Sequence, residues 1–241
     1  MKTNVYETVS VGSVNSPQPG RKEQFLELSV FLFLIVPSMA LSFFAIKQGS
    51  LSFSLSAVAT IFRDLSLVSL ILFFLWRNRE SLRTIGWNVA NFWKELILGV
   101  ILFFPFFYIS GILERALHAA GLSVPSTPQL AFLSPKGSVE IVLAVILVVV
   151  VAISEETIFR GYLMLRFRPM MNGLVAVLLS AVVFSLGHGY EGTAGLVTVG
   201  FMGIIFALVY KWRQSLVASM VMHFLQDFTV IVLLPLLGII H

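Results

Sequence analysis

Two glutamates and an arginine follow an apolar stretch in the C-terminal half of the chain. Residues 141–153 carry no charge, and Glu155, Glu156 and Arg160 come directly after them. An ionised side chain near the centre of a bilayer costs about 2.5–3.5 kcal/mol, so these charges need partners or a function. On a helix, Glu156 and Arg160 share one face and can form an ion pair, whereas Glu155 needs a different partner. The alternative is a helix end at the membrane interface, paired only for solubility.

Two histidines lie in other apolar segments. His188 ends the apolar run 174–187, where a capping or interfacial role is the alternative to a catalytic one. His223 lies inside an apolar segment with Asp227 four residues on, so both project from one helix face. A buried structural hydrogen bond is the alternative for this pair. Because polar groups in lipid tend to face one another or a wet cavity, we expect all these groups to meet at one cavity.

The residue types limit the chemistry. A carboxylate with an imidazole can deprotonate water, and a second imidazole with a hydrogen-bonding neighbour can stabilise an oxyanion. The chain has no cysteine, and no serine with an adjacent base stands out in a span. Hydrolysis of a peptide bond within the membrane fits these groups best. A metalloprotease with zinc on Glu155, His188 and His223, a proton-coupled membrane carrier and a catalytically silent scaffold remain alternatives.

The elements that position these residues are predicted to be transmembrane helices. Hydrophobic residues make up 58% of the 241 residues and charged residues 12%, against about 25% charged residues in a typical soluble domain. Segments near the ~20 residues needed to cross a bilayer are 25–46, 51–76, 96–117, 139–165, 174–188, 196–210 and 216–240. The fifth and sixth are short, and Pro235 could break the last. We therefore expect an all-α polytopic membrane protein with seven to eight transmembrane helices enclosing a polar cavity.

The chain divides into three parts by composition. Residues 1–24 are polar and indicate a flexible tail, residues 25–138 hold the N-terminal spans and loops, and residues 139–241 form the expected catalytic core. Arg63 and Asp64 interrupt the second span, and a mutually screened pair facing the bundle interior is the preferred interpretation over a functional role. Residues 77–94 combine cations with tryptophans, which suits a segment lying in the headgroup layer.

The distribution of lysine and arginine predicts the orientation. With the N-terminus inside, the inner set is Lys2, Arg21, Lys22, Arg77, Arg79, Arg83, Lys94, Arg166, Arg168, Lys211 and Arg213. The outer set is only Lys47, Arg115 and Lys136. Cytoplasmic loops carry the excess of positive residues, so the N-terminus is predicted to be cytoplasmic. Depths counted at about 1.5 Å per residue differ between the candidate residues but favour a cavity that opens toward the cytoplasm.

Three motifs in order resemble those of the CAAX-type intramembrane proteases, also called the CPBP or Abi family. Two glutamates, three residues and an arginine occur at 155–160. Phenylalanine, three residues and histidine occur at Phe184 and His188. Histidine, three residues and asparagine or aspartate occur at His223 and Asp227. The resemblance covers about residues 139–228, and the N-terminal half shares only its general character.

The resemblance implies an endopeptidase that cuts near the C-terminus of membrane-associated proteins or peptides, which include lipid-modified ones. The candidate catalytic residues are Glu155, Glu156, His188, His223 and Asp227, with Arg160 and Phe184 as structural or orienting residues. The resemblance implies that Glu155 activates water together with His188. His223 and Asp227 would stabilise the oxyanion, while Glu156 and Arg160 would orient the site.

One departure concerns Asp227, which stands where the family often has asparagine. An ionised aspartate repels an oxyanion, so Asp227 would be protonated or would hold His223 as an imidazolium. We expect no required cofactor, because Glu156 is committed to Arg160, with zinc as the alternative. The expected partners are the substrate and membrane lipid, without nucleic acid.

Overall fold

Helices account for the regular structure throughout the described chain. The computed structural model describes residues 20–47, 52–123 and 135–238, and every regular element in these ranges is a helix. The prediction of an all-α fold is therefore confirmed for them. The bounds are α1 (Arg21–Lys47), α2 (Phe53–Arg77), η1 (Leu82–Ile85), α3 (Phe92–Ala119), α5 (Gly137–Glu155), η2 (Glu156–Leu163), α6 (Met164–Phe167), α7 (Gly173–Leu186), η3 (Gly189–Glu191), α8 (Gly192–Arg213), α9 (Val217–Asp227), η4 (Phe228–Leu233) and α10 (Leu234–Leu236).

Six helices in the described ranges are long and apolar enough to cross a membrane. They are Arg21–Leu41, Phe53–Arg77, Phe92–Ala119, Gly137–Phe167, Gly189–Arg213 and Val217–Leu236. The shorter apolar helix α7 has 14 residues, fewer than the roughly 20 that span a bilayer. The protein is thus an integral membrane protein with several spans, but the expected number of seven to eight transmembrane helices is not confirmed.

Two expected details of the spans are wrong. The sixth span is not short, since α8 runs for 22 residues and begins at Gly192. Its first turn is held by Ser123, whose backbone N–H donates to Thr193 Oγ1 (2.9 Å) and whose hydroxyl accepts from Thr193 N–H (3.1 Å). Pro235 does not divide the last span, because α10 follows η4 without a gap and the span runs from Val217 to Leu236.

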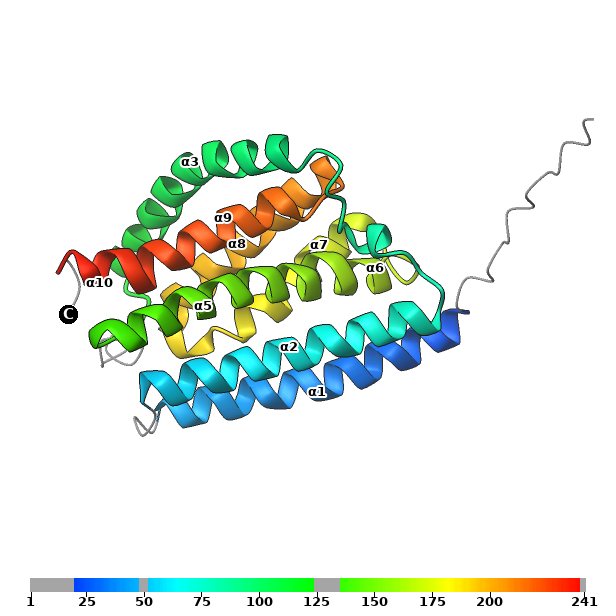
Figure 1. Ribbon diagram of the computed structural model, residues 1–241, viewed down its shortest axis with the longest axis horizontal. Coiled ribbons are helices and arrows are strands. Elements are labelled where there is room, and N and C mark those ends of the chain that lie inside the picture. Colours follow the sequence, from blue (N-terminus) through cyan, green and yellow to red (C-terminus); the bar gives the residue numbers. More distant parts are fainter. Residues whose placement is uncertain (1–19, 48–51, 124–134, 239–241) are drawn as a thin grey trace, which may run out of the picture.

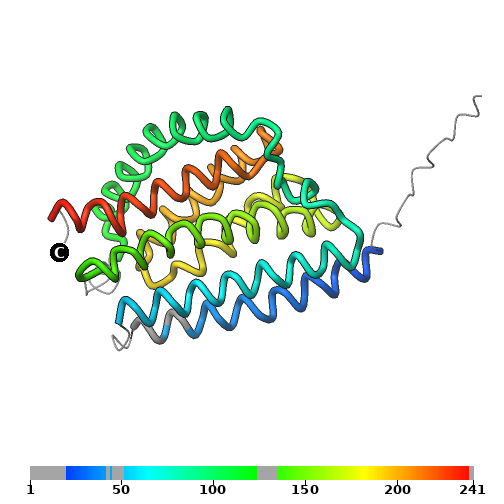
Figure 2. Tube along the Cα trace, viewed as in Figure 1, coloured from blue at the N-terminus to red at the C-terminus, as the bar shows by residue number. Residues whose placement is uncertain are grey.

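The bundle has α1 and α2 side by side along one flank (Figure 1). Helix α3 lies along the opposite flank, and α5 and α9 lie between. The Cα trace in Figure 2 shows α2 next to α5 and α9 next to α3, and both pairs are in contact. Helix α9 also packs against α5 and α8, and α7 packs against α8. The helices that carry the sequence motifs therefore meet in the middle of the bundle.

The polarity of the bundle is the reverse of that of a soluble protein. Large apolar side chains such as Phe33 and Val139 are 76% and 83% exposed. Charged side chains are buried, among them Asp64, Glu156 and Arg160. Charged groups within membrane spans face the bundle interior and pair with one another, so this distribution suits a bundle surrounded by lipid.

A buried ion-pair network closes the end of the bundle where α1 begins. Arg166 is 1% exposed and donates to both carboxylate oxygens of Glu80, at 2.9 and 2.6 Å. It also lies 3.0 Å from Glu27, which pairs with Arg77 at 2.6 Å. Arg77 and Arg166 both belong to the inner set of cations that predicts the orientation. In the structure, acidic side chains are paired with both of them. The cytoplasmic N-terminus stays a prediction.

The predicted polar tail ends earlier than expected. Helix α1 begins at Arg21, so residues 21–24 are helical rather than part of a flexible segment. The Glu23 carboxylate accepts a hydrogen bond from Gly20 N–H (2.9 Å), and Arg21 donates to the carbonyl of Pro169 (2.7 Å). These contacts fix the start of the helix. Residues 1–19 of the predicted tail lie outside the described residues.

Candidate active site

The two glutamates stand where a regular α-helix changes into a wider π-helical segment. Glu155 is the last residue of α5, and Glu156 is the first residue of η2. Within η2, the hydroxyl of Thr157 donates to the carbonyl of Ile153 (2.7 Å), a local bond that competes with the regular helix pattern. π-helical segments are rare and occur frequently at functional sites. The first motif therefore coincides with an irregularity of its helix.

The segment between α2 and α3 supports this irregular helix. Trp87 Nε1 donates to Thr157 Oγ1 (3.0 Å). Gly86 has φ 87°, a left-handed conformation that suits glycine, and its carbonyl accepts from the backbone N–H that precedes α9 (2.9 Å). A Cβ atom at Gly161 would lie 2.8 Å from the carbonyl oxygen of Ile85. The close approach of this segment to η2 therefore depends on glycine at position 161.

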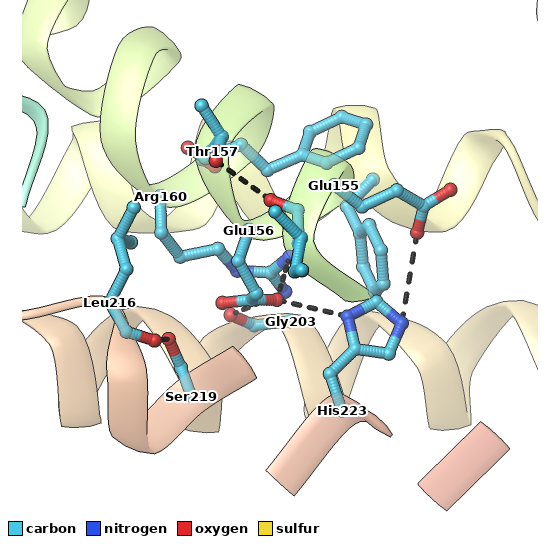
Figure 3. A network of polar contacts seen from close by, with 12 residues as sticks. Glu155, Glu156, Thr157, Arg160, Gly203, Leu216, Ser219 and His223 are labelled. Carbon is cyan, nitrogen blue, oxygen red and sulfur yellow. Dashed lines mark hydrogen bonds and ion pairs between the residues drawn. The ribbon is translucent and has the colours of Figure 1, made fainter. Parts of the chain in front are cut away.

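His223 lies among three carboxylates, and Figure 3 shows two of them, Glu155 and Glu156, facing its ring. Its Nδ1 is 3.1 Å from Glu156 Oε1. Its Nε2 is 3.8 Å from Glu155 Oε2 and 3.5 Å from Asp227 Oδ2. The predicted pairing of His223 with Asp227 on one face of α9 is confirmed. The contact with Glu156 was not predicted, because it joins helices that are far apart in the sequence.

Arg160 is paired with Glu156 and enclosed by aromatic rings. The predicted ion pair is confirmed, with Arg160 Nη1 2.9 Å from Glu156 Oε1 and both side chains buried. The guanidinium carbon lies 4.2 Å from the centre of the Phe184 ring and 5.2 Å from that of Phe206. Its Nη2 donates to the carbonyl of Gly203 (3.4 Å). Aromatic faces attract cations, so these rings fix Arg160 and, through it, Glu156.

His188 follows the end of α7 and turns one ring nitrogen toward its own helix. Its Nδ1 is 3.1 Å from the carbonyl oxygen of Phe184, so Nδ1 carries the donated hydrogen and Nε2 is left as an acceptor. The Phe184 ring contacts both imidazoles, at centroid distances of 5.0 Å from His188 and 5.9 Å from His223. Within the described residues, no ion pair joins His188 to Glu155. The two side chains could therefore activate water together only if a water molecule lay between them.

A cavity of about 380 Å³ lies beside the two histidines. Its lining consists of Phe107, Ser110, Gly111, Glu114, Phe184, His188, Tyr190, Glu191, Gly195, Thr198, Val199, Met202, Phe206, His223, Gln226, Asp227, Val230, Ile231 and Leu234. His188, His223 and Asp227 thus reach one common cavity. Glu155, Glu156 and Arg160 are not part of its lining, so the expectation that all these groups meet there is confirmed only in part. Its lining mixes charged, hydroxyl and apolar groups, so the expected polar cavity is not confirmed.

The cavity has a defined place along the bundle. Besides the residues of α7, α9, η4 and α10, its lining includes the second half of α3, η3 and several residues of α8. These parts lie toward the end of the bundle opposite to the start of α1 (Figure 1). The opening toward the cytoplasm stays a prediction, as does the cytoplasmic N-terminus.

Arg63 of α2 is a site neighbour that the sequence motifs do not include. Its Nε donates to Asp64 Oδ1 (2.8 Å), which confirms the predicted pair. Its Nη2 also lies 3.7 Å from Glu155 Oε1. The signal in the sequence was the presence of charges inside a span. The partner on α5 could not be found from spacing, because spacing relates residues of one helix only.

Three polar atoms in residues of the cavity lining have no hydrogen-bond partner: Ser110 Oγ, Thr198 Oγ1 and Gln226 Oε1. Ser110 is 2% and Thr198 3% exposed. Helical hydroxyls commonly bond to a carbonyl of their own helix, as those of Ser66 and Thr229 do at 2.7 Å. Ser110 and Thr198 depart from this pattern, and nothing in the sequence distinguished them from other serines and threonines.

The zinc alternative can be compared with the arrangement of the side chains. Among the described residues, no three histidine or acidic side chains are placed so that they could hold one metal ion. His223 directs both ring nitrogens at carboxylates, and His188 directs Nδ1 at a backbone carbonyl. The residues proposed for zinc, Glu155, His188 and His223, therefore do not fit a metal site in this arrangement.

Comparison with known protein families matches residues 137–229 to the family model described as type II CAAX prenyl endopeptidase, Rce1-like. The match begins at the first residue of α5 and ends within η4, so it includes all three motifs. The resemblance inferred from the motifs is thereby confirmed. Comparisons with curated proteins and with solved structures gave no match.

Proposed function

We propose that this membrane protein hydrolyses a peptide bond near the C-terminus of a membrane-associated protein or peptide, because residues 137–229 match the family model of type II CAAX prenyl endopeptidases. Lipid-modified proteins are one substrate class to assay. The observation that carries the proposal is the carboxylate of Glu155. Its Oε2 is buried, has no hydrogen-bond partner and faces His223 Nε2 at 3.8 Å.

Glu155 is the proposed general base. A carboxylate oxygen without a hydrogen-bond partner can accept a proton from water, and this transfer makes the water oxygen nucleophilic. His188 is the second acceptor, because its Nδ1 is occupied by the carbonyl of Phe184 (3.1 Å) and its Nε2 is left with a lone pair. The water oxygen bonds to the carbonyl carbon of the substrate. The carbon–nitrogen bond of the tetrahedral intermediate then breaks, and the proton taken up by the base passes to the leaving amine.

His223 is the proposed donor to the oxyanion of the tetrahedral intermediate. Carboxylates lie near both of its ring nitrogens, at 3.1, 3.5 and 3.8 Å, and these contacts fix the orientation of the ring. An N–H group aimed at the developing negative charge stabilises the transition state. Asp227 holds the ring and does not itself touch the oxyanion, which it would repel.

Glu156, Arg160 and Phe184 are proposed to orient the reacting groups. Glu156 contacts Nδ1 of His223 (3.1 Å) and is itself paired with Arg160 (2.9 Å). Phe184 supports the guanidinium of Arg160 and contacts both imidazoles. These contacts connect the three motifs into one unit, so a substitution in any of them will disturb the others.

The test is a cleavage assay with detergent-purified protein. A mixture of peptides and membrane proteins, with and without C-terminal lipid, is incubated with the protein, and products are identified by mass spectrometry. We expect wild type to release C-terminal fragments and Glu155→Gln to be slower by about 10²-fold or more, the usual contribution of a general base. Glu140→Gln is the matched control, because Glu140 lies on the same helix but bonds to Ser54 (2.7 Å).

Adding a chelator to the assay separates the metal-free from the metal-dependent mechanism. We expect cleavage to continue in its presence, because the proposed base and donor act on water and substrate directly. Loss of cleavage that zinc restores would contradict this. Equal rates for wild type and Glu155→Gln would contradict the assignment of the base, and substrate uptake into liposomes without any product would favour a carrier.

A further inference from the structure

The two adjacent glutamates have separate arginines. Glu156 is paired with Arg160, which belongs to the same helix, at 2.9 Å. Glu155 faces Arg63, which comes from α2, at 3.7 Å between Oε1 and Nη2. The other oxygen of Glu155, Oε2, faces His223. The Glu155 carboxylate is therefore next to a cation at one oxygen and has the other oxygen available for proton transfer.

Asp64 fixes the position of the Arg63 guanidinium. Both Nε and Nη2 of Arg63 lie 2.8 Å from Asp64 Oδ1, and Asp64 is 1% exposed. Adjacent residues of a helix point about 100° apart, so Arg63 must bend back to make this contact. If Arg63 served only as the counterion of Asp64, its guanidinium would not also need to face Glu155. The pair thus presents a fixed cation from α2 to α5, and these two helices are in contact.

We propose that Arg63 is a positioning residue that orients the carboxylate of Glu155 and stabilises its negative charge, with Asp64 as the anchor of Arg63. The inference rests on the proposed function, in which Glu155 is the base. Helix α2 lies outside the matched segment 137–229. The catalytic unit accordingly includes a residue of the N-terminal half of the chain.

The test compares Arg63→Gln, Arg63→Lys and Arg77→Gln in the cleavage assay. Arg77 is the matched control, since it is also on α2 and pairs with the buried Glu27 at 2.6 Å, away from the cavity. We expect Arg63→Gln to lower kcat on the order of 10- to 100-fold, the usual effect of removing a group that orients a reacting residue. KM should stay near the wild-type value. Arg63→Lys should recover a large part of kcat, and Arg77→Gln should leave kcat unchanged.

A double variant separates positioning from folding. Arg63→Gln leaves the buried Asp64 without its cation, which can destabilise the protein. Arg63→Gln with Asp64→Asn removes that charge, so the melting temperature should recover while kcat remains low. Recovery of kcat in the double variant would show that Arg63 serves only to neutralise Asp64. A higher KM with unchanged kcat would place Arg63 on the substrate, and both results overturn the proposal.

The failure of this inference can be told apart from failure of the proposed function. If wild type and Arg63→Gln cleave the substrate at the same rate, only the role of Arg63 is wrong. If wild type yields no product with any substrate, both proposals fall.

Discussion

The imidazole of His223 has carboxylates next to both of its nitrogens. These contacts determine which ring nitrogen can donate a hydrogen bond to a substrate. Nδ1 is committed to Glu156 at 3.1 Å. Nε2 faces Glu155 at 3.8 Å and Asp227 at 3.5 Å, distances that leave room for the ring to serve another acceptor. The contact with Asp227 is longer than the 3.1 Å contact with Glu156, so we expect Asp227 to orient the ring without exchanging a proton with it.

Asp227→Asn tests this role at the level of one residue. The amide oxygen of asparagine can still accept from Nε2, so the orientation of His223 is kept. We expect kcat to change by less than the roughly 2- to 10-fold that corresponds to losing one hydrogen bond of about 0.5–1.5 kcal/mol. His223→Ala should lower kcat by about 10²–10³-fold, as removal of an oxyanion donor does. The measurement is steady-state cleavage of one identified substrate.

The two variants are informative only as a pair. If Asp227→Asn were as damaging as His223→Ala, the carboxylate would take part in proton transfer. A structural defect is recognised separately by comparing the melting temperatures of both variants with that of wild type.

At the level of helices, the predictions that succeeded rest on local spacing. Apolar runs located the helices, and intervals of four residues located the pairs Glu156–Arg160 and His223–Asp227, both confirmed. The contacts that failed to be predicted join different helices. Arg63 reaching Glu155 is one example, because one sequence does not state which helix faces lie together. The expected number of spans is not confirmed, because the length of each helix depends on packing as well as on the apolar run.

The segment between α2 and α3 shows how much of the site depends on such packing. Cations and tryptophans in and beside this segment predict a position in the headgroup layer, and Trp76 at the end of α2 and Trp93 at the start of α3 are 75% and 72% exposed. Trp87, however, donates to Thr157 of η2, and Ile85 is buried against the same helix. This segment therefore supports the helix that carries Glu156 and Arg160.

Gly161→Ala tests whether this support matters. The added Cβ would lie 2.8 Å from the carbonyl of Ile85 and 3.2 Å from its Cβ, so the backbone on one side must move. Overpacking of this kind costs about 1–3 kcal/mol of the free energy of unfolding. We expect a lower melting temperature in detergent and slower cleavage, because η2 positions Glu156.

The control for this prediction is Gly200→Ala on α8. A Cβ atom there would meet only Ser185, at 3.6 Å, which is an ordinary contact. Alanine is favoured over glycine in a helix by roughly 0.5–1 kcal/mol, so this variant should be as stable as wild type or more stable. Equal melting temperatures for Gly161→Ala and wild type would contradict the prediction. They would show that the segment between α2 and α3 can move away from η2 without loss of stability.

At the level of the whole molecule, ion pairs connect the N-terminal helices with the segment that carries the motifs. Arg63 of α2 reaches Glu155, and Arg166 of α6 reaches Glu27 of α1 and Glu80 after α2. The division expected at residues 138 and 139 lies near the start of the family match at residue 137. Ion pairs cross that division at two places, at Glu155 and at Arg166. We therefore expect the two parts to unfold together.

The orientation of the bundle decides which side of the membrane supplies the substrate. The chain has no cysteine, so single cysteines can be introduced and labelled without background. Ala90 and Ala120 are exposed and flank α3, which is long enough to span the membrane. With a cytoplasmic N-terminus, Ala120→Cys should react with a membrane-impermeant maleimide in intact cells. Ala90→Cys should react only after permeabilisation.

The same labelling experiment determines where the cavity opens. The cavity is lined by the second half of α3, on the side of Ala120. Labelling of Ala120→Cys from outside would therefore mean that the substrate reaches the histidines from the outer half of the membrane. Labelling of Ala90→Cys from outside would instead reverse the predicted orientation and open the cavity toward the cytoplasm. Labelling of both from one side would show that α3 does not span the membrane.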